Sequence, residues 1–113
     1  MKKGDLFWAN LDPAIGSEIS KRRPVLIVSN DVNNQYAETI TVLPVTTSTE
    51  KIYPFEILIN AGEGNVPEKS KIKANQIRTI DKKRLFQKIG TISKSKLREA
   101  EQAILIHLDI ASA

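Results

Sequence analysis

The sequence predicts a mainly β protein with a C-terminal helix, folded as a small barrel or a curled antiparallel sheet. Short runs rich in apolar and β-branched residues recur at close spacing over residues 4–91, separated by Gly, Pro and polar segments. From Ser93 onward the apolar residues instead follow the i, i+3, i+4 spacing of an amphipathic helix. A chain of 113 residues suffices for one hydrophobic core, so we expect a single domain over residues 1–113.

The strands are expected where apolar runs meet turn-forming residues. In chain order, the candidates are residues 4–10, 24–28, 39–43, 55–59, 70–77 and 88–91. The run Pro24-Val25-Leu26-Ile27-Val28 is continuously apolar, which is typical of a strand buried on both faces. Pro44 is expected to interrupt or bulge the third strand, because proline cannot donate to a ladder.

The fifth candidate strand, residues 70–77, alternates polar and apolar residues. This pattern is typical of a half-exposed strand. Successive side chains of a strand point to opposite faces, so Lys71, Lys73 and Asn75 are expected to share its outer face.

The connecting segments are predicted from their polar composition. Residues 11–22 form a long loop, which in a domain this small is usually functional or disordered. Residues 30–36 and 46–51 are expected to be a polar turn and a polar loop, and residues 81–85 a short helical turn.

The last element is predicted to be a helix that begins after Ser93, a plausible N-cap. Its apolar face is expected to comprise Leu97, Ala100, Ile104, Leu108 and Ala111. His107 lies near the end of this helix, where a packed or helix-terminal role is the simpler interpretation than a catalytic one.

The charge of the chain is concentrated in one stretch. The net charge is +4, but residues 69–98 hold eleven Lys and Arg against Asp81 alone, a local charge of +10. Such a band favours a polyanion, because phosphates exchange their counterions for Lys and Arg. A solvated helix face or a site for an acidic protein partner remains the alternative.

Composition excludes several kinds of site. There is no Cys and only one His, so disulfides, zinc–thiolate sites, thiol nucleophiles and two-histidine mechanisms are excluded. We therefore expect no metal and no cofactor. No apolar run reaches the length of a membrane span, and the N-terminus lacks the apolar stretch of a signal peptide. A cytoplasmic protein without membrane contact is expected.

A few polar residues at strand ends are candidates for chemistry. Arg23 precedes Pro24, which favours extended geometry, where the long loop meets the buried strand; it is either a phosphate ligand, since its guanidinium matches phosphate oxygens, or an ordinary surface arginine. Glu18 in the same loop is either a positioned acid or a local salt-bridge partner. Thr46, like the hydroxyls after it, is either a phosphate ligand or ordinary loop composition.

Several segments, in this order and spacing, resemble the MazF/PemK family of toxin endoribonucleases. They are Gly4-Asp5-Leu6-Phe7-Trp8-Ala9, Asp12-Pro13-x-x-Gly16-Ser17-Glu18, Arg23-Pro24-Val25-Leu26-Ile27-Val28-Ser29-Asn30-Asp31, Pro44-Val45-Thr46-Thr47, Tyr53-Pro54-Phe55-Glu56 and Gln76-Ile77-Arg78-Thr79-Ile80-Asp81-Lys82-x-Arg84-Leu85. The resemblance covers nearly the whole chain.

This resemblance implies an SH3-like barrel that forms a homodimer and cleaves single-stranded RNA at specific sequences. It also implies a cognate antitoxin whose acidic C-terminal segment occupies the RNA site. By position, Arg23 and Thr46 take the catalytic pair, and Ser17 and Glu18 occupy the loop that shapes the site. Glu18 is the best-placed carboxylate for a base, the alternative being that its loop only orients Arg23. The expected RNA-binding residues are Ser17, Lys21, Thr47, Ser48, Lys71, Lys73, Asn75, Gln76 and Arg78.

Two positions depart from the family pattern. Many relatives carry Asp or Glu directly before the Gln of the RNA-binding strand, where this chain has Asn75. The histidine that some relatives carry before Glu18 is Ser17 here. Two other functions stay open at this point, namely a non-enzymatic gyrase inhibitor on the same fold and a catalytically inactive RNA-binding relative.

The expected reaction uses the RNA's own 2′-hydroxyl as nucleophile, giving a 2′,3′-cyclic phosphate and a 5′-hydroxyl. Arg23 is expected to stabilise the phosphorane charge and Thr46 to donate a second hydrogen bond. Trp8 is expected in the core rather than stacked on a base, and Tyr53 is a candidate for either place.

Overall fold

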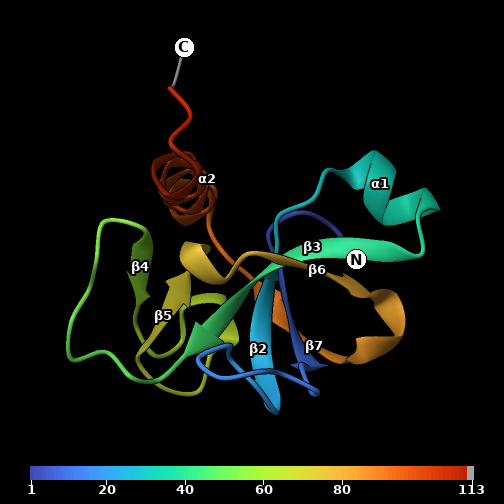
Figure 1. The fold of residues 1–113 in the computed structure, drawn as a ribbon, viewed down its shortest axis with the longest axis horizontal. Helices are drawn as coiled ribbons and strands as arrows, with labels where there is room; N and C mark the ends of the chain where they lie inside the picture. The colour runs from blue at the N-terminus through green and yellow to red at the C-terminus, as the bar shows by residue number, and fades with distance from the viewer. Residues whose placement is uncertain (112–113) are drawn as a thin grey trace.

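The computed structural model describes residues 1–111 and shows antiparallel strands followed by a C-terminal helix (Figure 1). The strands are β1 (Asp5–Asn10), β2 (Arg22–Ile27), β3 (Thr39–Thr46), β4 (Glu56–Ile59), β5 (Ser70–Lys73), β6 (Arg78–Asp81) and β7 (Leu85–Thr91). The helices are α1 (Asp31–Tyr36) and α2 (Lys94–Leu108), with 3-10 turns η1 (Glu63–Asn65), η2 (Ala74–Gln76) and η3 (Lys82–Arg84). The predicted class, mainly β with a C-terminal helix, is confirmed.

The strands are ordered β4-β5-β3-β2-β1-β7, and β6 pairs with β3 as well. Strands β6, β3, β2, β1 and β7, in that order, form a five-stranded part of the sheet. Its two edge strands, β6 and β7, are joined by η3 alone, so this part of the sheet curls as a small barrel would. Strand β3 also pairs with β5 in the other part of the sheet, which contains β4 and β5. Residues 39–42 of β3 pair with β6, and residues 45–46 pair with β5.

Pro44 does not interrupt β3, so that prediction is wrong. Pro44 stays opposite Val25 in the β2–β3 register. On the other side of the strand, Leu43 and Pro44 pair with neither β5 nor β6. The missing N–H of proline therefore coincides with the point where β3 exchanges one neighbour for the other.

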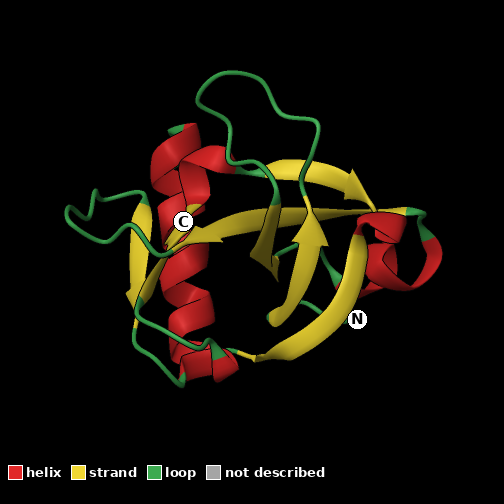
Figure 2. Ribbon diagram, turned by 90° about the horizontal axis from the view of Figure 1, so that it is seen from below, coloured by secondary structure: helices red, strands yellow, loops and turns green. Residues whose placement is uncertain are grey.

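Two apolar clusters hold the fold together. One contains Leu6 and Leu26 of the sheet with Ala100 and Ala103 of α2, and Figure 2 shows α2 lying along the side of the sheet that carries β4. The second fills the curled part and has Phe7 packed against it. Adjacent residues of β1 thus face opposite clusters, as the alternation of a strand requires.

The C-terminal helix begins where predicted, directly after Ser93. The Ser93 side chain is its N-cap and accepts a hydrogen bond from Lys96 N at 3.1 Å. Its predicted apolar face holds through Ile104 but not at Leu108 and Ala111, which are exposed. No helix among residues 1–111 is long and apolar enough to cross a membrane.

Two predicted segments differ from the structure. Residues 31–36 form the short helix α1 rather than a turn, with the Asn30 side chain accepting from Asn33 N at 2.8 Å as its N-cap. Residues 70–77 are not one strand but β5 followed by η2. The change of backbone at Ala74 means that Asn75 does not continue the face of Lys71 and Lys73. The predicted helical turn is confirmed as η3.

Candidate functional site

The start of β2 and the end of β3 border a cavity of about 170 Å³. Its lining includes Trp8, Arg23, Pro24, Val45, Thr46, Thr47 and Glu68, and we call it the strand-end pocket. The β2–β3 register places Val25 opposite Pro44. Arg23 lies two residues before Val25 and Thr46 two residues after Pro44, so both reach the same end of the β2–β3 pair and line one cavity.

Arg23 and Thr46 are both half-buried and held by local contacts. Arg23 Nε donates to Ser20 O at 3.3 Å, so the long loop orients the guanidinium and leaves its terminal nitrogens for another partner. Thr46 Oγ1 accepts from Ser48 N at 3.3 Å, which leaves the hydroxyl hydrogen free to be donated. The pocket thus presents a fixed cation and a hydroxyl donor.

Two residues of this pocket were missed or misassigned. Trp8, expected in the core, is half-buried and lines the pocket. Its place follows from the β1–β2 register, in which Trp8 lies opposite Pro24, next to Arg23. Glu68 brings a carboxylate to the same cavity from the segment before β5, and no sequence signal indicates this.

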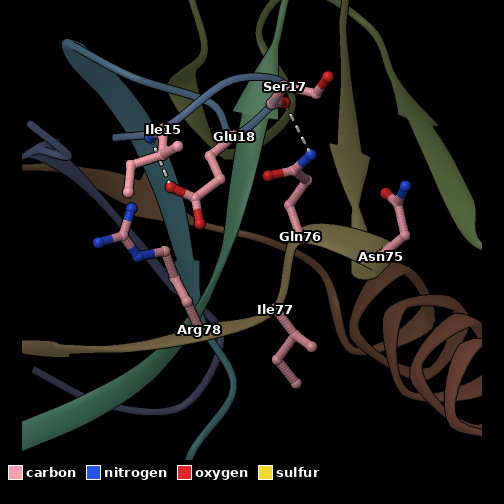
Figure 3. Close-up of a pocket in the computed structure, with 7 residues that line it drawn as sticks. All are labelled: Ile15, Ser17, Glu18, Asn75, Gln76, Ile77 and Arg78. Atoms are coloured by element: carbon pink, nitrogen blue, oxygen red, sulfur yellow. Dashed lines mark hydrogen bonds between the residues drawn. The ribbon is translucent and has the colours of Figure 1, made fainter. Parts of the chain in front are cut away.

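A second cavity, of about 400 Å³, lies between the long loop and η2. Figure 3 shows its lining residues, which are Ile15, Ser17, Glu18, Asn75, Gln76, Ile77 and Arg78. We call it the loop pocket. Four predicted site residues besides Glu18 meet here, while Arg23 and Thr46 do not line it.

Hydrogen bonds from η2 and β6 hold the long loop in place. Gln76 Oε1 accepts from Ile19 N at 3.2 Å. Gln76 Nε2 donates to Ser17 O at 3.3 Å, the dashed line between these residues in Figure 3. Arg78 Nη1 donates to Leu11 O at 3.4 Å. Both the oxygen and the nitrogen of the Gln76 amide bond to the loop backbone, so in this structure the Gln76 side chain holds the long loop in place.

Glu18 is also tied locally. Its Oε1 accepts from Ile15 N at 2.7 Å across a turn of the exposed loop, as Figure 3 shows. Glu18 lines the loop pocket rather than the strand-end pocket. The carboxylate expected beside Arg23 therefore lies in the neighbouring cavity.

Lys71 is not on an exposed face, so its predicted place on the outer face of a half-exposed strand is wrong. Its side chain is 9% exposed and its Nζ lies 3.1 Å from Glu56 Oε1, whose side chain is 1% exposed. The same Nζ donates to Lys51 O at 2.8 Å, and Lys73 Nζ lies 3.5 Å from Glu56 Oε2. The alternating pattern was real, but Glu56 on the neighbouring strand β4 supplies a buried partner.

The pKa of Glu56 reports this arrangement. Burial raises the pKa of this carboxyl, but the hydrogen bonds from Tyr53 N and from Lys71 outweigh it and hold the pKa below its ordinary value of 4.5. A charged Glu56 is therefore favoured in the folded protein. Lys71 lies opposite Thr46 in the β3–β5 register, so this ion pair braces the strand that ends in the strand-end pocket.

The basic stretch, residues 69–98, is not one continuous surface. Besides Lys71, Lys73 and Arg78, three of its cations contact protein groups: Arg84 donates to Asn10 O, Lys88 pairs with Asp5, and Lys96 donates to Leu58 O. Several of the others, including Lys69, Lys83, Lys94 and Arg98, are exposed. Much of the positive charge in this stretch thus takes part in contacts within the protein. The sequence alone did not indicate these contacts.

The remaining predicted residues lie at the surface. Lys21 is exposed at the end of the long loop, with a positive φ of 68°. The Tyr53 ring stacks on Phe55 with centroids 5.4 Å apart and remains 42% exposed. His107 is exposed in the last turn of α2, which confirms its helix-terminal placement. Among residues 1–111, no three metal-ligating side chains gather into a group.

Comparison with known proteins gives the family. A family model described as a PemK-like, MazF-like toxin of type II toxin–antitoxin systems matches residues 2–108. This chain belongs to that family. Its sequence is 39% identical to the endoribonuclease MazF9 of Mycobacterium tuberculosis, covering 99% of both chains. It is 37% identical to the endoribonuclease MazF of Staphylococcus epidermidis, covering 97% of this chain and 92% of the relative.

The fold agrees with solved members of the MazF family. A crystal structure of MazE–MazF from Deinococcus radiodurans superposes with a TM-score of 0.78 at 26% identity, covering 98% of this chain and 97% of the other. The resemblance found in the sequence motifs is thereby confirmed as MazF/PemK membership. The predicted endoribonuclease activity agrees with the names of both relatives.

Proposed function

We propose that this MazF-like toxin is an endoribonuclease that cleaves single-stranded RNA at specific sequences without metal. Acting on mRNA in the cytoplasm, it would inhibit translation and growth. The observation that carries the proposal is the strand-end pocket, where Arg23 at the start of β2 and Thr46 at the end of β3 line one cavity. A fixed cation beside a hydroxyl donor suits a phosphodiester at the moment its oxygens gain charge.

In the proposed reaction, the 2′-oxygen attacks the adjacent phosphorus and the bond from phosphorus to the 5′-oxygen breaks. The products are a 2′,3′-cyclic phosphate and a 5′-hydroxyl. The 2′-hydroxyl loses its proton to a base, and the departing 5′-oxygen gains one. Arg23 stabilises the phosphorane and Thr46 donates a second hydrogen bond, each contributing about 3–4 kcal/mol if they resemble other preorganised donors. Since arginine stays protonated, Arg23 is the stabiliser and not the base.

Two carboxylates are candidates for the base. Glu68 lines the same cavity as Arg23, whereas Glu18 lines the neighbouring one. The geometry therefore favours Glu68, and Glu18 shapes the loop that orients Arg23 through Ser20 O. In a test, Glu68→Gln should lower the single-turnover rate. If Glu18→Gln does so instead, the assignment is reversed.

We propose that the RNA passes over both pockets, because predicted RNA-binding residues line each of them. Ser17 lines the loop pocket, Thr47 lines the strand-end pocket, and Lys21 is exposed on the long loop just before β2. Ser48, whose backbone N donates to Thr46 Oγ1, and Lys73 are further candidate RNA contacts. For single-stranded RNA, the logarithm of the affinity should fall with the logarithm of salt by about 0.7 per phosphate contacted.

The partners proposed for the protein are a second copy of itself and a cognate antitoxin with an acidic C-terminal segment. Structural relatives include MazE–MazF assemblies. The acidic segment would compete with RNA for the exposed cations. Addition of a peptide of that segment should inhibit cleavage competitively and less strongly at high salt, and light scattering would give the oligomeric state.

The decisive experiment incubates the purified protein with single-stranded RNA in EDTA and analyses the new ends. Cleavage that leaves 2′,3′-cyclic phosphate and 5′-hydroxyl ends supports the proposal. Intact RNA, or 5′-phosphate ends, would contradict it. RNA binding without cleavage would identify an inactive relative, and inhibition of gyrase with intact RNA would identify the other toxin class.

A further inference from the structure

An exposed aromatic side chain lies on the edge strand β7, where that strand is irregular. Phe86 is 51% exposed. In the β1–β7 register, Ala9 pairs with Leu85. The next pair is Trp8 with Gln87, so Phe86 falls between the two pairs as the extra residue of a β-bulge. Bulges redirect side chains and are frequent beside active sites.

A cation covers the ring from the neighbouring strand. The Arg22 guanidinium lies over the Phe86 ring, with its Cζ 5.1 Å from the ring centroid. Strand β1 lies between β2 and β7, and Arg22 is opposite Asn10 at the end of β1. Among residues 1–111, no carboxylate lies within ion-pair distance of Arg22. The two side chains therefore combine a flat ring with a planar cation whose charge is not neutralised.

This aromatic–cation pair, Arg22 and Phe86, is continuous with the strand-end pocket. Arg22 lines that pocket and directly precedes Arg23, the proposed stabiliser of the phosphorane. Phe86 lines neither the strand-end pocket nor the loop pocket. The pair thus extends the surface beside the proposed catalytic groups, in a direction that neither pocket covers.

We propose that Phe86 and Arg22 form a stacking subsite for the base of a nucleotide next to the scissile phosphate. The inference rests on the proposed RNA cleavage and adds a contact that strengthens binding without selecting a sequence. Unpaired bases stack on aromatic rings and on the guanidinium plane of arginine, and every base has such a face. The ring face carries partial negative charge, so the pair suits a base better than the carboxylates of an acidic peptide.

Loss of the ring should weaken RNA binding and leave the chemistry intact. Phe86→Ala should raise KM about fivefold to a hundredfold, the range for loss of one base–aromatic stack, and change kcat by less than about twofold. Phe86→Leu keeps an apolar side chain without a ring and should behave like Phe86→Ala, whereas Phe86→Trp should keep a low KM. The cleaved motif should be the same in all of these proteins. Tyr36→Ala is the matched control, because Tyr36 is 77% exposed on α1 and lines neither pocket.

The direct test scans a single-stranded RNA in which one nucleotide at a time lacks its base. The nucleophilic 2′-hydroxyl is replaced with hydrogen, so the RNA binds without being cleaved. For the wild type and Tyr36→Ala, removal of the base at one position beside the cleavage site should raise Kd about fivefold or more. For Phe86→Ala, whose Kd is already raised, the same removal should change Kd by less than about twofold. A purely structural role of Phe86 would not abolish the effect of one base.

The failures are distinguishable. Unchanged KM in Phe86→Ala, a loss of kcat alone, or equal sensitivity to base removal in both proteins would overturn the inference but not the proposed function. Weakened binding of a polyglutamate peptide with unchanged RNA binding would also overturn it, since the pair would then be a protein contact. A wild type that binds RNA without cleaving it would contradict the proposed function, and the scan on that RNA would still decide the inference. A wild type that binds no RNA would overturn both. Thermal unfolding of each variant confirms that the compared proteins are folded.

Discussion

The two pockets differ in how the chain builds them. In the strand-end pocket, Arg23 and Thr46 lie at adjacent ends of β2 and β3, two strands that pair directly from Val25 and Pro44 onward. The loop pocket is formed by an exposed loop that Gln76 and Arg78 hold through side-chain hydrogen bonds. A rigid frame suits charge stabilisation, which depends on exact placement, and an adaptable loop suits choice among ligands. Rate and sequence preference should therefore be separable.

The largest effect is expected at Arg23. Arg23→Ala should lower the cleavage rate by about a thousandfold or more, because it removes the fixed cation from the developing charge. The fold should persist, as judged by thermal unfolding, and any residual cleavage should keep the wild-type motif. Arg98→Ala, which removes an exposed cation on α2, is the matched control and should leave the rate unchanged. A rate within about fivefold of wild type would remove Arg23 from the mechanism.

Substitution of Thr46 should give the next largest effect and again change the cleavage rate without changing the sequence preference. Thr46→Ala should lower the single-turnover rate by about ten- to a thousandfold, the loss of one preorganised donor. Thr46→Ser keeps the hydroxyl and should recover most of the rate. The cleaved sequence should be the same in all three proteins, and an altered motif in Thr46→Ala would show that the two pockets are not separable.

Substitution of Gln76, in the loop pocket, should change the sequence preference more than the cleavage rate. Gln76→Ala releases Ile19 N and Ser17 O and loosens the loop. We expect KM to rise and the motif to become less selective, while kcat falls by less than about tenfold, since the strand-end pocket keeps its register. A large loss of kcat with an unchanged KM and motif would mean that the loop pocket takes part in the chemistry.

The smallest effect concerns the buried ion pair behind the strand-end pocket. Glu56→Gln should reduce the free energy of unfolding at neutral pH by about 1–3 kcal/mol, the worth of hydrogen bonds to a charged group. The pKa of folded Glu56 is held below its ordinary value of 4.5, so the charged form stabilises the fold above that value. This stabilisation is lost as the pH falls through the lower folded pKa.

Urea unfolding at a series of pH values checks this linkage. Between about pH 5 and pH 2 the wild type should lose more stability than Glu56→Gln. Burial raises the pKa of Asp5, but the hydrogen bonds from Thr91 and from Lys2 N outweigh it and lower that pKa. Asp5 is present in both proteins, so its contribution cancels in the comparison. Equal acid sensitivity would show that Glu56 is not a stabilising charge.

Sequence patterns predicted the strand-end pocket better than the loop pocket, for a physical reason. Extended strands and a capped helix are local features, so the positions of Arg23 and Thr46 at strand ends and of Ser93 as an N-cap followed from neighbouring residues. The pairing of β2 with β3 then brought the first two together. The loop pocket depends on contacts between Ser17 and Gln76, which are distant in sequence.

The errors have the same origin. Lys71 follows the alternation of an exposed strand position, yet Glu56 on the adjacent strand draws it into a buried ion pair. Trp8 has the composition of a core residue, but its cross-strand partner Pro24 places it at a pocket edge. In each case a neighbour on another strand decides the outcome. The residues next to each position in the sequence do not indicate that neighbour.

The most direct test compares Arg23→Ala and Gln76→Ala on one randomised RNA pool in EDTA, with sequencing of the cleaved ends over time. We expect Arg23→Ala to lose about a thousandfold in rate and keep its motif, while Gln76→Ala still cleaves, with less than about a tenfold loss of kcat, but with a less selective motif. An Arg23→Ala protein that cleaves at the wild-type rate, or a Gln76→Ala protein that loses rate with its motif intact, would contradict the division between the two pockets.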